Sequence, residues 1–175
     1  YVIDGSQYDW QSSFGALQAA LANAQGLTLY TGSLGSLTHR NVEHVHLKGV
    51  DNTDSYGNAY SADLLIFQGQ GGSYHGGSCN TWYADTFYAD WSSATGALTW
   101  INDPSQTQTV NGVEVSGLER LLLTTGAGDD VLSNLNTSTA DTFITGAGHD
   151  RVDAGAGDDT IDTGAGNDTL DAGTG

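Results

Sequence analysis

A nine-residue repeat near the C-terminus constrains this chain more than any other feature. Three units follow one another without a gap over residues 145–153, 154–162 and 163–171. Each unit has Gly at its second and fourth positions, Asp at its sixth and an aliphatic residue at its eighth. A flexible linker has no reason to keep an aliphatic residue in every unit, so the pattern predicts a repeat architecture of stacked turns and very short strands.

The Gly-x-Gly-x-Asp part of each unit suits a tight turn that faces a cation. Glycine allows positive φ, which lets the backbone turn its carbonyls inward. Ca²⁺ prefers about six to eight oxygen ligands, many of them carbonyls and carboxylates. One turn offers about three such oxygens, so two stacked turns would complete a coordination sphere. The repeats therefore predict calcium as the cofactor, with several ions bound.

The charge balance supports a cation partner. The chain has 21 acidic and 4 basic residues and a formal net charge of −17, and all but three of the acids are Asp. A compact domain with this charge repels itself unless something neutralises it, and it is a poor partner for nucleic acid or an anionic membrane. No apolar run is long enough to span a bilayer, so we expect no membrane insertion.

The first two-thirds of the chain predicts a β-rich flank with one helix. A helix is expected near 12–25, with Phe14, Leu17 and Leu21 on one face. Alternating or apolar runs predict strands at 27–30, 42–47, 64–67, 82–83, 86–88, 98–101 and 118–123. Asn-Gly within 110–115 predicts a hairpin. We expect residues 1–120 to form this flank, with degenerate solenoid rungs, and residues 121–175 to form the regular repeat domain.

The repeats resemble the Gly-Gly-x-Gly-x-Asp-x-aliphatic-x nonapeptide of the RTX (repeats-in-toxin, haemolysin-type calcium-binding) family. The match is strong across 145–171, and 125–133 is a further good unit. Asn134 and Leu135 then look like a two-residue insertion, and the unit at 136–144 keeps Asp141 and Phe143 but lacks both glycines. The resemblance implies an all-β fold, a parallel β-roll. Its expected interior ladder is Leu132, Phe143, Val152, Ile161 and Leu170.

In that fold successive turns alternate between two edges, so the resemblance implies that each ion lies between turns two repeats apart. The first implied site joins Gly146, Gly148 and Asp150 to Thr163, Ala165 and Asp168. The second joins Gly126, Gly128 and Asp130 to Thr145, Ala147 and Asp150. On the other edge, the third joins Thr137, Thr139 and Asp141 to Ala154, Ala156 and Asp159. A fourth would join Gly155, Gly157 and Asp159 to Ala172 and Thr174. The remaining candidates, Gly164 and Gly166, are the glycines of the last complete unit.

The flank offers weaker metal candidates. Asp63 and Asp85 each precede an apolar strand, as the repeat Asp does, and could hold one more Ca²⁺. His44 and His46 could bind a transition metal with His39 or His75, although two polar side chains on the wet face of a strand is the simpler reading. Cys79 is the only cysteine, which excludes an internal disulfide. No catalytic motif occurs, so we expect no enzyme activity.

Together these features predict a calcium-binding structural module of a secreted or cell-surface RTX protein, serving in adhesion, a surface layer or a fibre. The resemblance implies type I secretion and folding on calcium outside the cell. Two alternatives stay open: the non-catalytic tail of an RTX protease or lipase, and a carbohydrate-binding module using Trp82, Tyr88 and Trp91. Because the chain starts without Met and stops at the fourth position of a repeat, we expect it to be a fragment. Self-association or continuation of the solenoid beyond Gly175 is then expected.

Overall fold

The computed structural model describes residues 63–67, 71–77, 84–135 and 137–175, together with four earlier strands at 2–4, 28–30, 36–38 and 45–48. Every regular element in this part of the chain is a strand, and the expected all-β fold is confirmed. The helix expected near 12–25 and the strand expected at 82–83 lie outside the described residues.

Sixteen strands are described, each of them three to five residues long. In the first half they are β1 (Val2–Asp4), β2 (Thr28–Tyr30), β3 (Ser36–Thr38), β4 (Val45–Lys48), β5 (Asp63–Ile66), β6 (Gly72–His75), β7 (Thr86–Asp90) and β8 (Thr99–Ile101). In the second half they are β9 (Gln108–Val110), β10 (Val113–Ser116), β11 (Arg120–Thr124), β12 (Val131–Ser133), β13 (Thr142–Ile144), β14 (Arg151–Asp153), β15 (Thr160–Asp162) and β16 (Thr169–Asp171).

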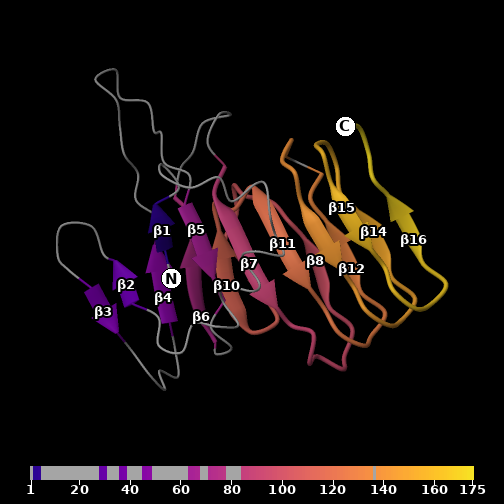
Figure 1. The fold of residues 1–175 in the computed structure, drawn as a ribbon, viewed down its shortest axis with the longest axis horizontal. Coiled ribbons are helices and arrows are strands. Elements are labelled where there is room, and N and C mark those ends of the chain that lie inside the picture. Colours follow the sequence, from indigo (N-terminus) through magenta and orange to yellow (C-terminus); the bar gives the residue numbers. More distant parts are fainter. Residues whose placement is uncertain are drawn as a thin grey trace.

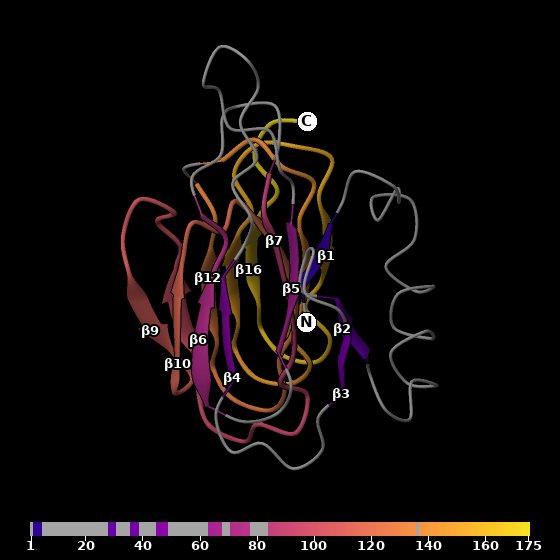
Figure 2. The ribbon, with the colours of Figure 1, turned by 90° about the vertical axis from the view of Figure 1, so that its left-hand side faces the viewer.

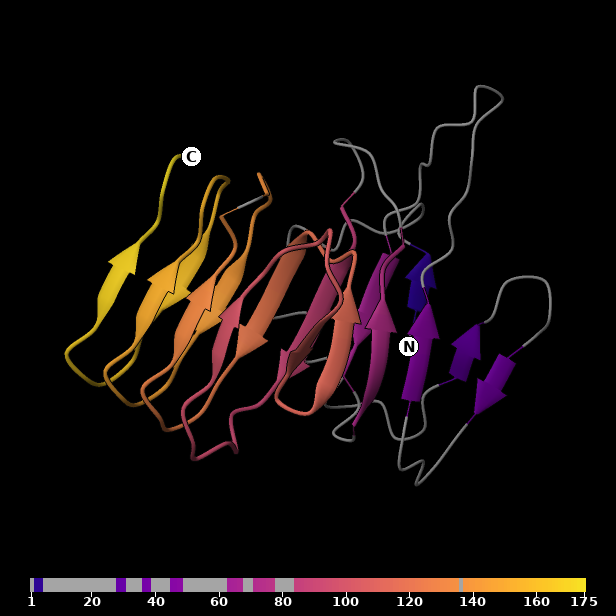
Figure 3. The ribbon, with the colours of Figure 1, turned by 180° about the vertical axis from the view of Figure 1, so that it is seen from behind.

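The strands of the repeats alternate between two sheets, in which they pair in parallel. One sheet has the order β1-β5-β7-β11-β13-β15, and another has the order β16-β14-β12-β8. A third, β4-β6-β10-β9, continues the second side toward the N-terminus (Figure 1). Seen along the long axis, β5 and β7 lie in one layer and β4, β6, β10 and β12 in the other (Figure 2). The view from behind shows the turns of the repeats following one another as rungs (Figure 3). The molecule is therefore a flattened parallel solenoid.

The repeat strands are short because turn residues flank them on both sides, and the middle residue of each points inward. Leu132, Phe143 and Val152 are almost fully buried, and Ile161 is partly buried. Leu132, Val152 and Leu170 are in register across β12, β14 and β16. Leu170 was expected in the interior ladder but is 54% exposed, because β16 pairs only with β14.

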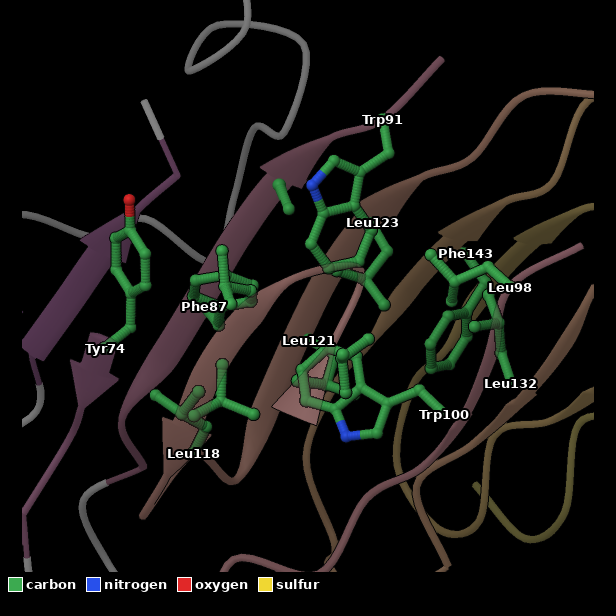
Figure 4. Close-up of a cluster of buried hydrophobic side chains, with 14 of the residues drawn as sticks. Tyr74, Phe87, Trp91, Leu98, Trp100, Leu118, Leu121, Leu123, Leu132 and Phe143 are labelled. Carbon is green, nitrogen blue, oxygen red and sulfur yellow. The ribbon is translucent and has the colours of Figure 1, made fainter. Parts of the chain in front are cut away.

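Aromatic side chains fill the core where the flank meets the first repeats. The Phe87 ring makes edge contacts with Tyr74 and Trp100 at centroid distances of 5.2 and 5.9 Å. Trp91 packs against Phe87 and Trp100 in the same cluster (Figure 4). Such pairs contribute about 0.5–1.5 kcal/mol each beyond the area they bury. This end of the described solenoid therefore has a conventional apolar core.

The flank and the repeats share one sheet. β5 pairs parallel with β7, and β7 pairs parallel with β11 in a register that sets Phe87 beside Leu121. The predicted hairpin is confirmed: β9 and β10 pair antiparallel around Asn111 and Gly112, whose φ values are 45° and 77°. Two successive positive φ values belong to the tight turn that Asn-Gly favours. The expected boundary at residue 120 falls at the start of β11 and stays a prediction.

Candidate metal centre

The turns of the repeats stack in two columns, one at each edge of the solenoid. Isolated parallel bridges join Ala127 to Ala147 and Ala147 to Ala165 in the first column. In the second column they join Ser138 to Ala156 and Ala156 to Thr174. Each turn therefore lies against the turn two repeats away, the arrangement in which the implied ligands of each site approach one another.

Glycine is required where these turns touch. Gly146 has a φ of 85°, and a Cβ there would lie 2.3 Å from the carbonyl oxygen of Gly126. Gly164 repeats the situation one turn later, with a φ of 66° and its Cβ position 1.9 Å from the Gly146 oxygen. Both the left-handed backbone and the close approach exclude a side chain. The loop carbonyls of neighbouring turns are thereby brought together.

Backbone hydrogen bonds hold the stacked turns in register. In the first column the Ala165 amide donates to the Gly146 oxygen at 2.8 Å, and the Gly148 amide donates to the Ala165 oxygen at 3.0 Å. The Gly128 amide donates in the same way to the Ala147 oxygen at 2.8 Å. A carbonyl oxygen has two lone pairs, so each of these acceptors keeps capacity for a cation.

The sixth-position aspartates form two columns of their own, and each uses Oδ1 to hold the stack. Asp150 Oδ1 accepts the backbone amide of Asp130 at 2.9 Å, and Asp168 Oδ1 accepts that of Asp150 at 3.0 Å. On the other edge, Asp159 Oδ1 accepts the amide of Asp141 at 2.8 Å. A carboxylate that accepts a backbone amide in this way is fixed in orientation, so the position of its second oxygen, Oδ2, is also fixed.

The second carboxylate oxygens fall into two groups. Within the described chain, the buried Oδ2 atoms of Asp150 and Asp159 have no hydrogen-bond partner. By contrast, Oδ2 of Asp130 accepts from the Thr125 hydroxyl, and Oδ2 of Asp141 accepts from the Asn134 amide at 2.7 Å. A buried carboxylate oxygen without a donor is costly unless a cation neutralises it. Asp150 and Asp159 therefore fit calcium ligands by their surroundings as well as by their chemistry.

In the absence of an ion, burial disfavours the ionised form of two of these aspartates. Burial raises the pKa of Asp141 to about 7, against hydrogen bonds from the Leu121 amide and Asn134 that lower it. Burial also raises the pKa of Asp159, and the negative charge of Asp158 adds to that effect. A bound divalent cation favours the ionised form and opposes both effects.

The structure brings together the turn residues of the four implied sites, but their role as ligands stays a prediction. The backbone amides of Asp130, Asp150 and Asp141 donate to the carboxylates of Asp150, Asp168 and Asp159, respectively. His149, at the variable fifth position, is exposed as expected, and its Nδ1 accepts the Asn167 amide at 2.9 Å. Within the described residues no three His, Cys, Asp or Glu side chains form a metal cluster, whereas each implied site needs only two aspartates beside its carbonyls.

Sequence reasoning missed the donors that satisfy Asp130 and Asp141. Asn134 was identified only as part of an insertion, and Thr125 only as the first residue of the repeat unit at 125–133. The interruption of the nine-residue spacing at Asn134 and Leu135 was the available signal, because an insertion next to a unit without its glycines marks a turn built differently from the others.

The flank candidates have different outcomes. Asp85 is buried, and its amide donates to Glu119 Oε2 at 2.8 Å. His75 lies 3.3 Å from Glu114 Oε1 through Nε2 and 2.7 Å from Ser116 Oγ through Nδ1. His39, His44 and Cys79, like the side chains of His46 and Asp63, lie outside the described residues.

The aromatic residues considered for carbohydrate binding are core residues where they are described. Tyr88 and Trp91 are both buried, so neither offers a ring face to a sugar, and Trp82 lies outside the described residues. No helix long and apolar enough to cross a membrane occurs in the described part of the chain.

Comparison with known proteins agrees with the geometry of the turns. The model of the RTX calcium-binding nonapeptide repeat matches residues 136–175 with four copies. No curated protein and no solved structure matches the chain. The matched segment includes both unpartnered aspartates and the stacked turns around them. Residues 136–175 of this chain are therefore RTX repeats, a calcium-binding structural module, and calcium is the ion that they bind.

Proposed function

We propose that this chain is a non-catalytic, calcium-dependent structural module of a protein that is exported by type I secretion to the cell surface or the medium. The observation that carries the proposal is the pair of buried, unpartnered oxygens, Asp150 Oδ2 and Asp159 Oδ2, within stacked glycine turns. These groups destabilise a folded chain without an ion and stabilise it with one. Folding of the repeats is then coupled to calcium binding.

The coupling suits export. Calcium sites of extracellular modules have dissociation constants of roughly 10⁻⁴ to 10⁻³ M, so low internal calcium would leave such repeats unfolded and external calcium would fold them. The net charge of −17 favours the same behaviour, since self-repulsion opposes the compact state until cations neutralise it. We propose that the module is held unfolded during export and folds outside the cell.

We propose a role in adhesion, a surface layer or fibre assembly, which the exposed edge of β16 favours. All three residues of β16 are exposed, and the strand pairs only with β14. An exposed strand edge is a template for further pairing. A further rung of the same solenoid or a second copy would cover Leu170 and extend the stack.

The proposal is tested by far-UV circular dichroism and ion counting during calcium titration. We expect β-structure to increase with calcium and several ions to bind per chain. The variant Asp150→Asn keeps an oxygen for the Asp130 amide but loses the charge, so it should bind fewer ions and need more calcium to fold. Asp158→Asn, the same change at an exposed neighbouring position, is the matched control. A titration without any gain of β-structure would contradict the proposal.

A further inference from the structure

Asn134 lies between the regular unit at 125–133 and the unit at 136–144 that lacks glycines. It follows β12 directly, in the two-residue insertion that interrupts the nine-residue spacing, and it is 0% exposed. Its backbone amide donates to the Asp153 oxygen at 3.0 Å, so Asn134 lies beside Ala154 in the next rung. A polar side chain buried this completely needs partners for all its hydrogen-bonding groups.

Every polar group of the Asn134 side chain has a partner. Its Nδ2 donates to Asp141 Oδ2 at 2.7 Å and to the Glu119 carbonyl oxygen at 2.8 Å. A primary amide has two N–H donors, so both are used. Its Oδ1 accepts from Asn102 Nδ2 at 2.9 Å. The side chain thus joins the carboxylate of one turn to a carbonyl of the preceding rung, as a bound cation joins oxygens of two turns.

The next rung lacks this arrangement. At the position equivalent to Asn134 stands Ala154, which has no side-chain donor, and Oδ2 of Asp159 has no partner there. Asp141 and Asp159 share one contact, because each uses Oδ1 to accept a backbone amide of the preceding rung, at 2.7 and 2.8 Å. The presence or absence of the Asn134 amide therefore separates a satisfied aspartate from an unsatisfied one in the same column.

The turn around Asp141 is also built without left-handed backbone. Among the described non-glycine residues Asn111 alone has a positive φ, so Thr137 and Thr139 lack the positive φ of the glycines at 146, 148, 155 and 157. The Thr139 hydroxyl instead donates to the Glu119 oxygen at 2.8 Å. The Thr139 oxygen still approaches Gly157 as the Gly128 oxygen approaches Gly148, but the oxygen that approaches Gly155 is that of Asn134 and not that of Thr137.

From these contacts we infer that the Asn134 amide takes the place of a calcium ion at Asp141, so that this rung forms without calcium and the ions of that edge begin at Asp159. The inference rests on the proposed function, because it assumes that the other turns bind calcium. The inference reduces the aspartate ligands of the third implied site from two to one. Asp141 is a structural partner of Asn134, and Asp159 is the ligand.

The first test counts bound calcium ions by equilibrium dialysis in two matched variants, Asp141→Asn and Asp159→Asn. Both replace a carboxylate by an amide of the same size in the same column. We expect Asp141→Asn to bind as many ions as the unaltered chain and Asp159→Asn to bind at least one fewer. An equal loss of ions in both variants would overturn the inference.

The second test converts the built-in donor into an acceptor. Asn134→Asp sets a second carboxylate against Asp141, where a bound cation would relieve the repulsion between the two. We expect its thermal midpoint to fall by several degrees without calcium, to recover in saturating calcium, and one additional ion to bind. Asn167→Asp adds the same charge at an exposed position of another turn and should leave the ion count unchanged.

The two tests separate the inference from the proposed function. If the unaltered chain binds no calcium, the proposed function fails, whatever the variants do. If the unaltered chain binds calcium but Asn134→Asp is destabilised equally with and without it, and gains no ion over Asn167→Asp, the inference alone fails.

Discussion

At the scale of single residues, the repeat divides its work between glycine and aspartate. Glycine removes the side chain where two turns come together, as at Gly146 and Gly164. Aspartate fixes the stack through one oxygen and leaves the other for an ion or an internal donor. A carboxylate with both oxygens engaged stabilises its turn, whereas one with a buried free oxygen makes the turn depend on calcium.

A glycine substitution tests this close approach directly. Gly146→Ala should lower the free energy of unfolding in saturating calcium by about 2 kcal/mol or more, because alanine is strained at positive φ and its Cβ would meet the Gly126 oxygen. Urea unfolding followed by circular dichroism measures the change. Gly96→Ala is the control, since nothing lies within 4 Å of a Cβ at that position. Equal effects of the two substitutions would refute the argument.

The sequence could predict which turn residues approach one another, but not which aspartates are free for an ion. Gly-x-Gly-x-Asp spacing determines the contacts of Asp150 with Asp130 and Asp168, because the same unit recurs at a fixed interval. The state of Asp141 depends on Asn134, whose partners come from Asn102, Glu119 and Asp141. Asn102 and Glu119 lie outside the repeats, so the nine-residue pattern contains no information about them.

At the scale of elements, each three-residue strand of the repeats contributes one interior side chain to a ladder. How much that side chain is buried, and so how much it stabilises the fold, depends on the neighbouring strands. Leu132 in β12 has strands on both sides, β8 and β14, whereas Leu170 in β16 has β14 alone. The two leucines are in register through Val152, yet one is 1% and the other 54% exposed. The hydrophobic gain per rung therefore declines toward the end of the described stack.

The two leucines form a matched pair for measurement. Leu132→Ala should cost about 2–5 kcal/mol of stability in saturating calcium, because it removes a buried side chain and leaves a cavity. Leu170→Ala should cost less than about 1 kcal/mol, because most of that side chain is already in water. Thermal or urea unfolding of both variants checks the difference. Similar costs would show that another chain or rung covers Leu170 in solution.

Strand positions followed from apolar runs, but strand partners did not. The run at 98–101 predicted a strand and β8 is found at Thr99–Ile101, whose partner is β12. More than 20 residues separate these two strands, and they include the β9–β10 hairpin and β11. A periodic pattern identifies partners only where the period is unbroken. Outside the repeats, pairing is decided by how the aromatic core packs, which the strand pattern does not reveal.

At the scale of the whole molecule, the means of stabilisation changes along the solenoid axis. Tyr74, Phe87, Trp91 and Trp100 fill the interior around β6, β7 and β8 (Figure 4). Beyond Phe143 the large interior side chains are those of Val152, Ile161 and Leu170, with the small Ala154 beside them, and the burial of the large side chains decreases rung by rung. The unpartnered aspartate oxygens occur in this second region. Apolar burial thus supports one end, and we propose that calcium supplies at the other end the stabilisation that the core does not.

This gradient predicts that removing calcium unfolds the molecule unevenly. On chelation, backbone amides in β14, β15 and β16 should lose their protection from hydrogen exchange, because those rungs bury little apolar surface and contain Asp150 and Asp159 without an ion. Amides in β7, β8 and β11 should stay protected, since their strands pack on the aromatic cluster. Hydrogen–deuterium exchange with and without calcium, read by mass spectrometry on peptides from each region, measures both.

Uniform loss of protection across β7 to β16 would mean that the aromatic end also depends on calcium. Unchanged protection in β14 to β16 would mean that the repeats are stable without the ion. Protection lost only beyond Asp150 would place the start of calcium dependence where the carboxylates first lack an internal donor, which connects the behaviour of the whole chain to the Asn134 contact.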